Sequence, residues 1–336
     1  MTEYPIANKI FVKSSNTSYK ILFRYSLSLI VFLLYVSFCL LIKKDYSNGI
    51  KLFETFIISS IISIIFQCII NITRKKKGII KIFTEDNVLA SSVIISLFSY
   101  KEKFIVIIIA SLISEIVKLF SKNIGLSSSL YGVLFILIYK RITGNIIELP
   151  FIRNIFSQSK DIIKLSLGLT FQNLSPVVSI SLLLYLFQKK SIKYPIVFSY
   201  IISYIITVTI FSILNSNGLN YFIINILGSN VLFIAVFLSG DYKITPISIE
   251  GGIIYGIILS TLTFILSHID LYLAPVISCI LSSLFLTRFI DKISFKLKYN
   301  RKFYKIMTLS SIGISLLGII IISIIKWVQL NSFLFV

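Results

Sequence analysis

The sequence is poor in acidic residues and in most side chains that carry catalysis. It has 13 Asp and Glu against 33 Lys and Arg, one His and three Cys in 336 residues. Cys39, Cys68 and Cys279 each lie inside an apolar run, and none is spaced from another as metal ligands are. A disulfide framework, a zinc site and an iron–sulfur cluster held by this chain are therefore disfavoured. A Ser-His-Asp hydrolase would have to use His268, which lies between two apolar runs.

The glycine-rich motifs of nucleotide-binding proteins are also missing, since the chain has neither a P-loop nor a Rossmann fingerprint. Its formal net charge of +20 does not indicate nucleic-acid binding, because the lysines and arginines gather in short clusters between apolar runs. Such clusters set the orientation of membrane proteins and meet anionic lipid. We therefore expect the lipid bilayer, and no nucleic acid, as a partner.

Apolar runs dominate the chain, which is 56% hydrophobic with a mean hydropathy of +0.94. Runs long enough to cross about 30 Å of hydrocarbon recur along almost the whole length. Spanning segments have no water for their backbone groups and must be helices. We predict an all-α, polytopic integral membrane protein with about 10–11 transmembrane helices, including short or re-entrant segments. The expected segments are 25–42, 52–72, 87–98, 104–120, 126–139, 165–187, 195–214, 221–239, 250–267, 271–287 and 304–328.

The distribution of charge suggests three parts: a basic cytoplasmic arm (1–24), a multi-helix membrane domain (25–292), and a basic loop with an additional C-terminal transmembrane helix (293–336). The first apolar run is long enough to remain as a span, so we expect no cleavable signal peptide. If the N-terminus is cytoplasmic, most basic clusters fall on the cytoplasmic side. The basic segment 140–164 is the exception, because strict alternation places it outside.

A few polar residues interrupt the apolar runs. Glu115 and Lys118 are three residues apart and share a helical face. They predict either an ion pair near the end of a span, with Lys118 reaching the interface, or part of an ion or cofactor pathway. Gln172 and Asn173 precede Pro176, which suggests either a broken helix that exposes carbonyls or hydrogen bonds between helices.

The stretch "FLSGDYKITPISIEGGIIYG" (237–256) connects two apolar runs through a turn headed by Asp241. We expect a tight connector in which Asp241 caps a helix or meets a neighbouring subunit. An apolar span, an Asp-containing turn, Thr245-Pro246, and then Gly251 and Gly256 at the start of the next span resemble the RnfD family of membrane proteins from Rnf-type ion-translocating electron-transport complexes. A membrane component of the sodium-pumping NADH:quinone reductase is a close relative in that family.

The resemblance extends over roughly residues 8 to 292, in order. Downstream, "LYLAPVISCILSSLFLTRFID" resembles the family's next span. Upstream, the basic loop "RKKKGIIKIFTEDNV" resembles one that leads to an acidic-polar pair before a short span, here Asp86 and Asn87. "EIVKLFSKNIG" resembles a Lys-containing stretch before a Gly-rich loop. The candidate functional residues are therefore Asp241, Lys118, Asp86 and Asn87.

The resemblance implies a membrane subunit of an Rnf-like complex that couples electron transfer to ion translocation, which would be a translocase in the bacterial cytoplasmic (inner) membrane with a cytoplasmic N-terminus. It implies other membrane subunits as partners, a sodium ion or a proton as the moving ion, and FMN or riboflavin as the cofactor. The family's Ser-x-Ala-Thr motif for covalent FMN is absent, and Thr143 and Thr170 have different neighbours. A transporter or scaffold that kept the fold and lost the redox cofactor is the alternative.

Overall fold

Every regular element in the described part of the chain is a helix, which confirms the all-α prediction. Four of these helices are long and apolar enough to cross a membrane, and shorter apolar helices accompany them. The prediction of a polytopic membrane protein is therefore confirmed as well. The computed structural model describes residues 18–42, 44–73, 88–120, 128–143, 166–167, 174–214, 218–240, 245–268, 273–287 and 289–291.

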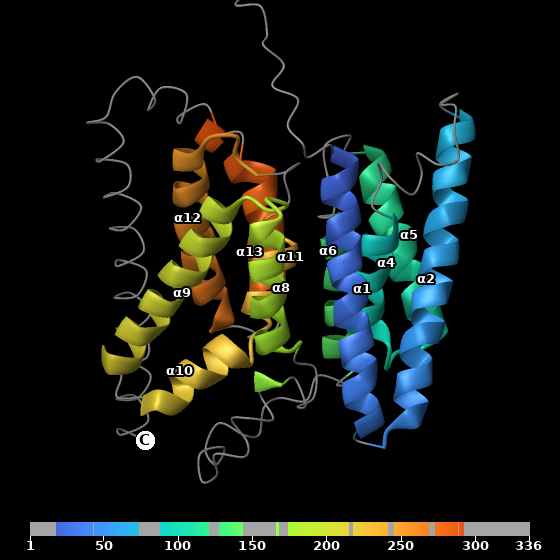
Figure 1. Ribbon diagram of the computed structural model, residues 1–336, viewed down its shortest axis with the longest axis horizontal. Helices are drawn as coiled ribbons and strands as arrows, with labels where there is room; N and C mark the ends of the chain where they lie inside the picture. Colours follow the sequence, from blue (N-terminus) through green and yellow to red (C-terminus); the bar gives the residue numbers. More distant parts are fainter. Residues whose placement is uncertain are drawn as a thin grey trace, which may run out of the picture.

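The helices form two groups that lie side by side (Figure 1). The first group contains α1 (Ser18–Ile42), α2 (Tyr46–Thr73), α4 (Val88–Ser99), α5 (Phe104–Phe120) and α6 (Ser128–Ile142). The second contains α8 (Pro176–Gln188), α9 (Tyr194–Leu214), α10 (Gly218–Leu227), α11 (Val231–Phe237), α12 (Ile249–Ser267) and α13 (Ala274–Leu281), which continues as a π-helical turn, η2 (Ser282–Leu286).

The two groups repeat one pattern of helix packing. In the first, the short and deeply buried α4 packs against α1, α2 and α6, and α5 packs against α2 and α6. In the second, the short and fully buried α11 packs against α8, α9 and α13, and α12 packs against α9 and α13. The chain enters the second group from the opposite end, so equivalent helices run in opposite directions (Figure 1). This arrangement is an inverted repeat, which many membrane transporters share.

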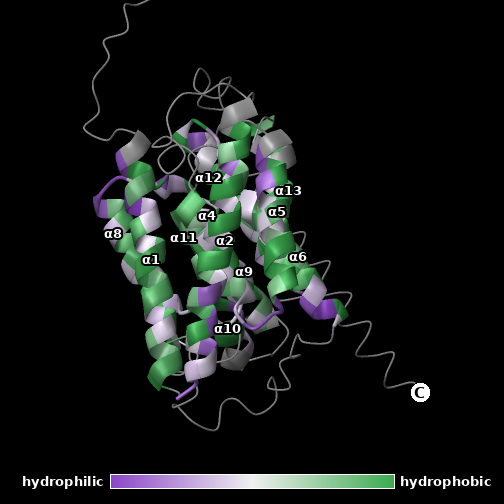
Figure 2. Cartoon of the chain, turned by 90° about the vertical axis from the view of Figure 1, so that its right-hand side faces the viewer, coloured by the Kyte–Doolittle hydropathy of each residue, from purple (hydrophilic) through white to green (hydrophobic). Residues whose placement is uncertain are grey.

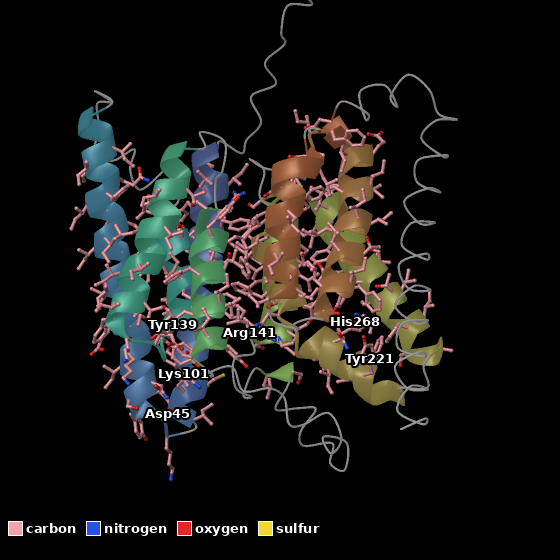
Figure 3. The ribbon with its side chains drawn as sticks, turned by 180° about the vertical axis from the view of Figure 1, so that it is seen from behind. Asp45, Lys101, Tyr139, Arg141, Tyr221 and His268 are labelled. Carbon is pink, nitrogen blue, oxygen red and sulfur yellow. The ribbon has the colours of Figure 1, made fainter. Side chains whose placement is uncertain are left out.

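The bundle has two ends with different residues. One end, which we call the Asp45 end, carries Asp45, Lys101 and Arg141 from the first group and His268 from the second (Figure 3). At the opposite end, which we call the Arg24 end, Arg24 Nη1 donates a 2.8 Å hydrogen bond to the carbonyl of Lys189. The basic segment 140–164 therefore starts at the Asp45 end, whereas the basic residues of α1 and of the α8–α9 connection lie at the Arg24 end. Strict alternation of the spans across the membrane predicts this separation.

Apolar side chains face outward along the long helices, and polar ones face inward. On α2, the isoleucines at 57, 61, 65 and 69 are all more than half exposed, whereas Ser59, Ser63 and Gln67 are buried. Hydrophobic residues cover the helices along most of their length, and several hydrophilic ones gather near helix ends (Figure 2). This is the distribution that a lipid environment favours, because polar groups are satisfied only inside the protein.

Two predicted segments differ from the structure. Residues 221–239 are not one helix: α10 and α11 are separated at 228–230, where Asn230 adopts a left-handed φ of 56° and redirects the chain. The helix expected over 165–187 is not one helix: Ser166 is helical, residues 174–175 are not, and α8 begins at Pro176, with Ser175 as its N-cap. Proline fits the first turn of a helix because its missing N–H would have no partner there. The predicted segment 304–328 lies outside the described residues.

Asp45 caps the connection between α1 and α2 and provides a pH-dependent contact. Its carboxylate accepts hydrogen bonds from Asn48 Nδ2 at 2.7 Å and from Ser47 Oγ at 3.4 Å. The Asn48 hydrogen bond, with smaller contributions from Ser47 and from the charge of Lys101, lowers the pKa of Asp45 below its usual value. The resulting stabilisation is present above the unfolded-state pKa of about 4 and is lost as pH falls through the lower folded-state pKa.

We expect Asp45→Asn to lower the thermal unfolding midpoint of detergent-purified protein slightly at pH 7. The carboxylate is solvent-accessible, so the effect should not exceed about 0.5 kcal/mol. Unfolding midpoints of the two proteins, measured from pH 7 to pH 3, should converge on the acid side. A difference that stays constant over this range would mean that the charge of Asp45 plays no part.

Candidate functional site

A carboxylate is buried between helices α2 and α5. Glu115 lies in α5, and its side chain is 0% exposed. Gln67 of α2 donates a hydrogen bond from Nε2 to Glu115 Oε2 over 2.6 Å, and Nζ of Lys118 lies 3.8 Å from the same oxygen. Charged groups at membrane depth are costly and usually face other polar groups. These three residues, which we call the Glu115 cluster, provide such an environment.

Helix geometry brings Lys118 to Glu115. The two residues are three positions apart, so their side chains share one face of α5. Lys118 also lies in the last turn, where the helix dipole favours a positive charge. Its side chain is only 10% exposed, so it is held largely inside the protein. The predicted ion pair is confirmed, and the expected extension of Lys118 to the interface stays a prediction.

Buried serines lie near the Glu115 cluster in the sequence of both helices. Ser59 and Ser63 precede Gln67 on α2 by eight and four residues, which places them on the same side of the helix. Ser114 is the neighbour of Glu115 on α5. All three serines are 0% exposed, and within the described structure their hydroxyls have no hydrogen-bond partner. Buried hydroxyls of this kind are costly and call for an explanation such as a bound water or ion.

The second group of helices has a polar interior of different chemistry. Tyr200 and Thr263 form a 3.0 Å hydrogen bond between α9 and α12, and Thr263 continues to Ser278 of α13 at 2.7 Å. Tyr255 contacts Ser282 at 2.9 Å. These hydroxyls tie three helices together without a charged side chain, as interhelical hydrogen bonds in membranes do. The helices equivalent to α2 and α5 are thus joined by neutral contacts.

The family model described as NQR2, RnfD, RnfE family matches residues 128–300, just over half of the 336-residue chain. The chain belongs to the NQR2, RnfD, RnfE family. No curated protein sequence matches it. The family match confirms the resemblance to RnfD and its relatives, and it supports a membrane subunit of an electron-transport or ion-translocating complex. The matched region begins at α6, so the Glu115 cluster lies before it.

Of the four residues predicted from the sequence to be functional, the structure describes only Lys118. Lys118 lies in the Glu115 cluster. Asp86, Asn87 and Asp241 lie outside the described residues, so their roles stay predictions. Gln67 was not predicted as part of a site. The signal that could have found it is its place as a lone amide within the apolar run "ISIIFQCII".

The connector before α12 is held by residues other than Asp241. Ser248 is the N-cap of α12, and its Oγ accepts a 2.9 Å hydrogen bond from the Gly251 N–H. Lys193 Nζ donates 3.0 Å hydrogen bonds to the carbonyls of both Thr245 and Pro246. Ser248 is thus the N-cap of α12, and the prediction that Asp241 caps a helix or meets a neighbouring subunit stays a prediction.

The only histidine in the sequence belongs to an aromatic cluster. His268 Nε2 lies 3.4 Å from the hydroxyl of Tyr221, and its ring contacts Phe211 and Phe264 with centroid separations of 5.0 and 4.9 Å. Tyr221 and His268 meet at the Asp45 end (Figure 3). Edge-on contacts of this kind are ordinary aromatic packing. They indicate that His268 stabilises the end of α12.

Thr143, one of the two threonines considered for covalent FMN, lies at the end of α6. Its hydroxyl donates to the carbonyls of Tyr139 at 2.9 Å and Lys140 at 3.3 Å. Its neighbours also lack the Ser-x-Ala-Thr pattern. Thr170, the other threonine considered, lies outside the described residues. We therefore assign no flavin attachment site among the residues that the structure describes.

Proposed function

We propose that this chain is a membrane subunit of an Rnf-like electron-transport complex, and that it helps couple electron transfer to movement of sodium ions or protons across the bacterial cytoplasmic membrane. Its N-terminus would be cytoplasmic, with other membrane subunits of the complex as its partners. Family membership supports the class of complex. The observation that carries the role in ion movement is the fully buried carboxylate of Glu115 between two apolar helices.

The geometry of the Glu115 cluster suits reversible ion binding. Gln67 fixes one carboxylate oxygen through a short hydrogen bond. Lys118 balances the charge from 3.8 Å, which is longer than a direct hydrogen bond and leaves the pair loosely joined. A proton or a sodium ion that reaches Glu115 would replace Lys118 as the balancing charge. Ionisable residues that face the interior of membrane proteins commonly mark such pathways.

The decisive experiment compares Glu115→Gln with the wild type in everted membrane vesicles of the native host. Electron flow would be started with NADH or with a chemically reduced low-potential dye. Ion movement would be followed as uptake of ²²Na⁺ and as quenching of a pH-sensitive dye. We expect Glu115→Gln to reduce the ion signal at least about tenfold, because the neutral amide cannot alternate between free and ion-bound carboxylate.

Glu250→Gln provides the matched control, because it removes the same charge in the first turn of α12, away from the Glu115 cluster. This variant should keep wild-type ion uptake. Protein abundance in the membrane, measured by immunoblot, must be similar for all three proteins. Ion uptake by Glu115→Gln that equals the wild-type rate would contradict the proposal.

A transporter or scaffold without redox activity is the second candidate, and the absence of the Ser-x-Ala-Thr motif favours it. Flavin fluorescence of the denatured protein band, with intact mass alongside, distinguishes the two. Covalent flavin, or flavin released on denaturation, would support a place in the electron path. A protein purified from native membranes without either would favour the transporter or scaffold.

A further inference from the structure

A line of polar residues runs along the buried face of α2. Thr55, Ser59, Ser63 and Gln67 follow one another at intervals of four residues, which places them one above another on the helix. Their exposed fractions are 1%, 0%, 0% and 3%, whereas isoleucines at the same interval form the exposed face. Twelve residues of α-helix span about 18 Å, more than half of the hydrocarbon thickness. These four residues, which we call the α2 polar stripe, therefore extend through much of the membrane interior.

The α2 polar stripe leads from the Asp45 end to the Glu115 cluster. Its last member, Gln67, donates the 2.6 Å hydrogen bond to Glu115. One turn before its first member, Lys51 is exposed near the start of α2. The stripe lies where α2 packs against α4 and α5 (Figure 1). Next to it, Ser60 donates a 3.0 Å hydrogen bond to Ser92 of α4. A continuous line of polar residues thus connects an exposed helix end with a buried carboxylate.

The middle of the α2 polar stripe presents hydroxyl groups that other residues do not use. Ser59 and Ser63 have no hydrogen-bond partner within the described structure. Buried serines of the neighbouring α4 differ, since they donate to carbonyls of their own helix, as Ser96 does to Val93 at 2.8 Å. Ordered water is the usual partner of a buried hydroxyl that no protein group satisfies. A hydroxyl both donates and accepts, so water held by Ser59 and Ser63 would form a hydrogen-bonded chain along the stripe.

The groups around Glu115 favour a proton over a sodium ion. Gln67 presents its Nε2 to Glu115 Oε2, and a carboxylate only accepts hydrogen bonds, which fixes this orientation of the amide. The Lys118 ammonium lies 3.8 Å from the same oxygen. Hard metal cations are bound by several oxygen atoms, and these two contacts present N–H groups instead. A proton needs only a carboxylate oxygen and a hydrogen-bonded route to it.

We propose, on the basis of the ion movement proposed for the Glu115 cluster, that the α2 polar stripe is a water-lined proton path and that the ion handled by this cluster is a proton. A hydrated proton that reaches Glu115 forms an O–H bond on the carboxylate and leaves a neutral water. The Lys118 ammonium then faces a neutral carboxylic acid and loses a proton to water beyond the last turn of α5, where its side chain is 10% exposed. The proton on Glu115 moves to the Lys118 amine, which restores the ion pair after one proton has passed.

Proton flux through the purified full-length protein in liposomes tests this path without an electron donor or partner subunits. A potassium gradient with valinomycin sets the membrane potential, an enclosed pH-sensitive dye reports proton entry, and ²²Na⁺ uptake is measured in parallel. We expect the wild type to admit protons, but not ²²Na⁺, above the level of empty liposomes. Ser59→Ala/Ser63→Ala should lower proton entry at least about tenfold, because the path loses two hydrogen bonds to water.

Matched variants separate the path from general effects of a lost hydroxyl. Ser28→Ala removes an equally buried hydroxyl on α1, which donates to the carbonyl of Tyr25 at 2.7 Å, and should keep the wild-type proton flux. Ser63→Thr keeps a hydroxyl in the stripe and should retain most of the flux. Ser59→Ala/Ser63→Ala removes no hydrogen bond within the described structure, so we expect it to unfold at the wild-type midpoint.

The possible outcomes distinguish this path from the proposed function. Equal proton flux in the wild type and in Ser59→Ala/Ser63→Ala would overturn the path, and so would a wild type that admits no protons. Entry of ²²Na⁺ that Glu115→Gln abolishes would replace the proton by sodium and leave the proposed ion movement intact. Failure of the proposed function is detected separately, in native vesicles where Glu115→Gln moves ions at the wild-type rate.

Discussion

Lys118→Met is expected to lower the free energy of unfolding by about 3 kcal/mol. The substitution removes the positive charge that lies 3.8 Å from Glu115 while keeping a long side chain in place. The Glu115 carboxylate, 0% exposed, would then keep the hydrogen bond from Gln67 but lose its counter-charge. Breaking a buried pair by removing one partner is destabilising mainly because the other charge stays buried.

A double-mutant cycle measures this effect. Lys118→Met, Glu115→Gln and the double variant would be unfolded in mixed micelles, with folding followed by far-UV circular dichroism. The double variant should be more stable than Lys118→Met, with a coupling energy of about 2 kcal/mol. Lys103→Met serves as the control for removal of an exposed lysine. Single effects that simply add would show that the two charges do not depend on each other.

The cycle also separates stability from function. The double variant Glu115→Gln/Lys118→Met lacks the titratable carboxylate but has no buried, unbalanced charge. If the Glu115 cluster handles ions, this variant should fold and yet fail to move them. If the cluster only joins α2 to α5, the double variant should recover both its fold and its ion movement. A neutral pair that restores activity would therefore assign a structural role to Glu115 and Lys118.

The two halves of the inverted repeat differ in the polar residues that join their helices. In the first group, the helix pair α2–α5 encloses a carboxylate, an amide and an ammonium group. In the second, the equivalent pair α9–α12 and its neighbour α13 are joined by neutral hydroxyl groups. Among the described residues, the same arrangement of helices thus carries charge in the first group and neutral hydrogen bonds in the second. If the Glu115 cluster handles ions, as proposed, the binding step lies in the first group.

Hydrophobic runs are sufficient to predict the class of this protein and most of its helices. Segment 104–120 agrees with α5 at both limits, because an apolar run bounded by charges has little freedom in where it ends. The break between α10 and α11 falls at Gly228, Ser229 and Asn230, a turn-prone triplet within an apolar stretch, where Asn230 takes a left-handed conformation. Its side chain accepts a hydrogen bond from the Leu174 N–H, a contact 56 residues away that local patterns do not reveal.

The candidate site is also only partly predictable from local sequence patterns. The spacing of Glu115 and Lys118 on one helix predicts their ion pair, because helical geometry is local. Gln67 is 48 residues away, and only the packing of α2 on α5 brings it to Glu115. Local patterns therefore identify charges that must be satisfied, and tertiary structure decides which residues satisfy them.

Gly256→Ala is expected to lower the free energy of unfolding by about 3 kcal/mol. Gly256 lies where α12 crosses α9, the most extensive helix contact in the described structure. A Cβ at this position would lie 2.8 Å from the carbonyl oxygen of Ile196 and 2.9 Å from the backbone N of Tyr200, and it would also meet Ser199 Oγ. Ser199 can rotate away, but the backbone atoms of α9 cannot, so the two helices must separate.

Gly49→Ala is the matched control, because a Cβ at Gly49 meets only Leu40 Cβ at an ordinary 4.0 Å. Gly49 lies in the first turn of α2, where alanine is a better helix former, so stability should stay equal or rise by up to about 1 kcal/mol. Unfolding midpoints of both variants and the wild type, measured in one detergent, test the pair of predictions. A Gly256→Ala protein as stable as the wild type would show that α9 and α12 can move apart without loss of packing. The close approach of these helices would then not be required for the hydroxyl contacts between Tyr200 and Thr263.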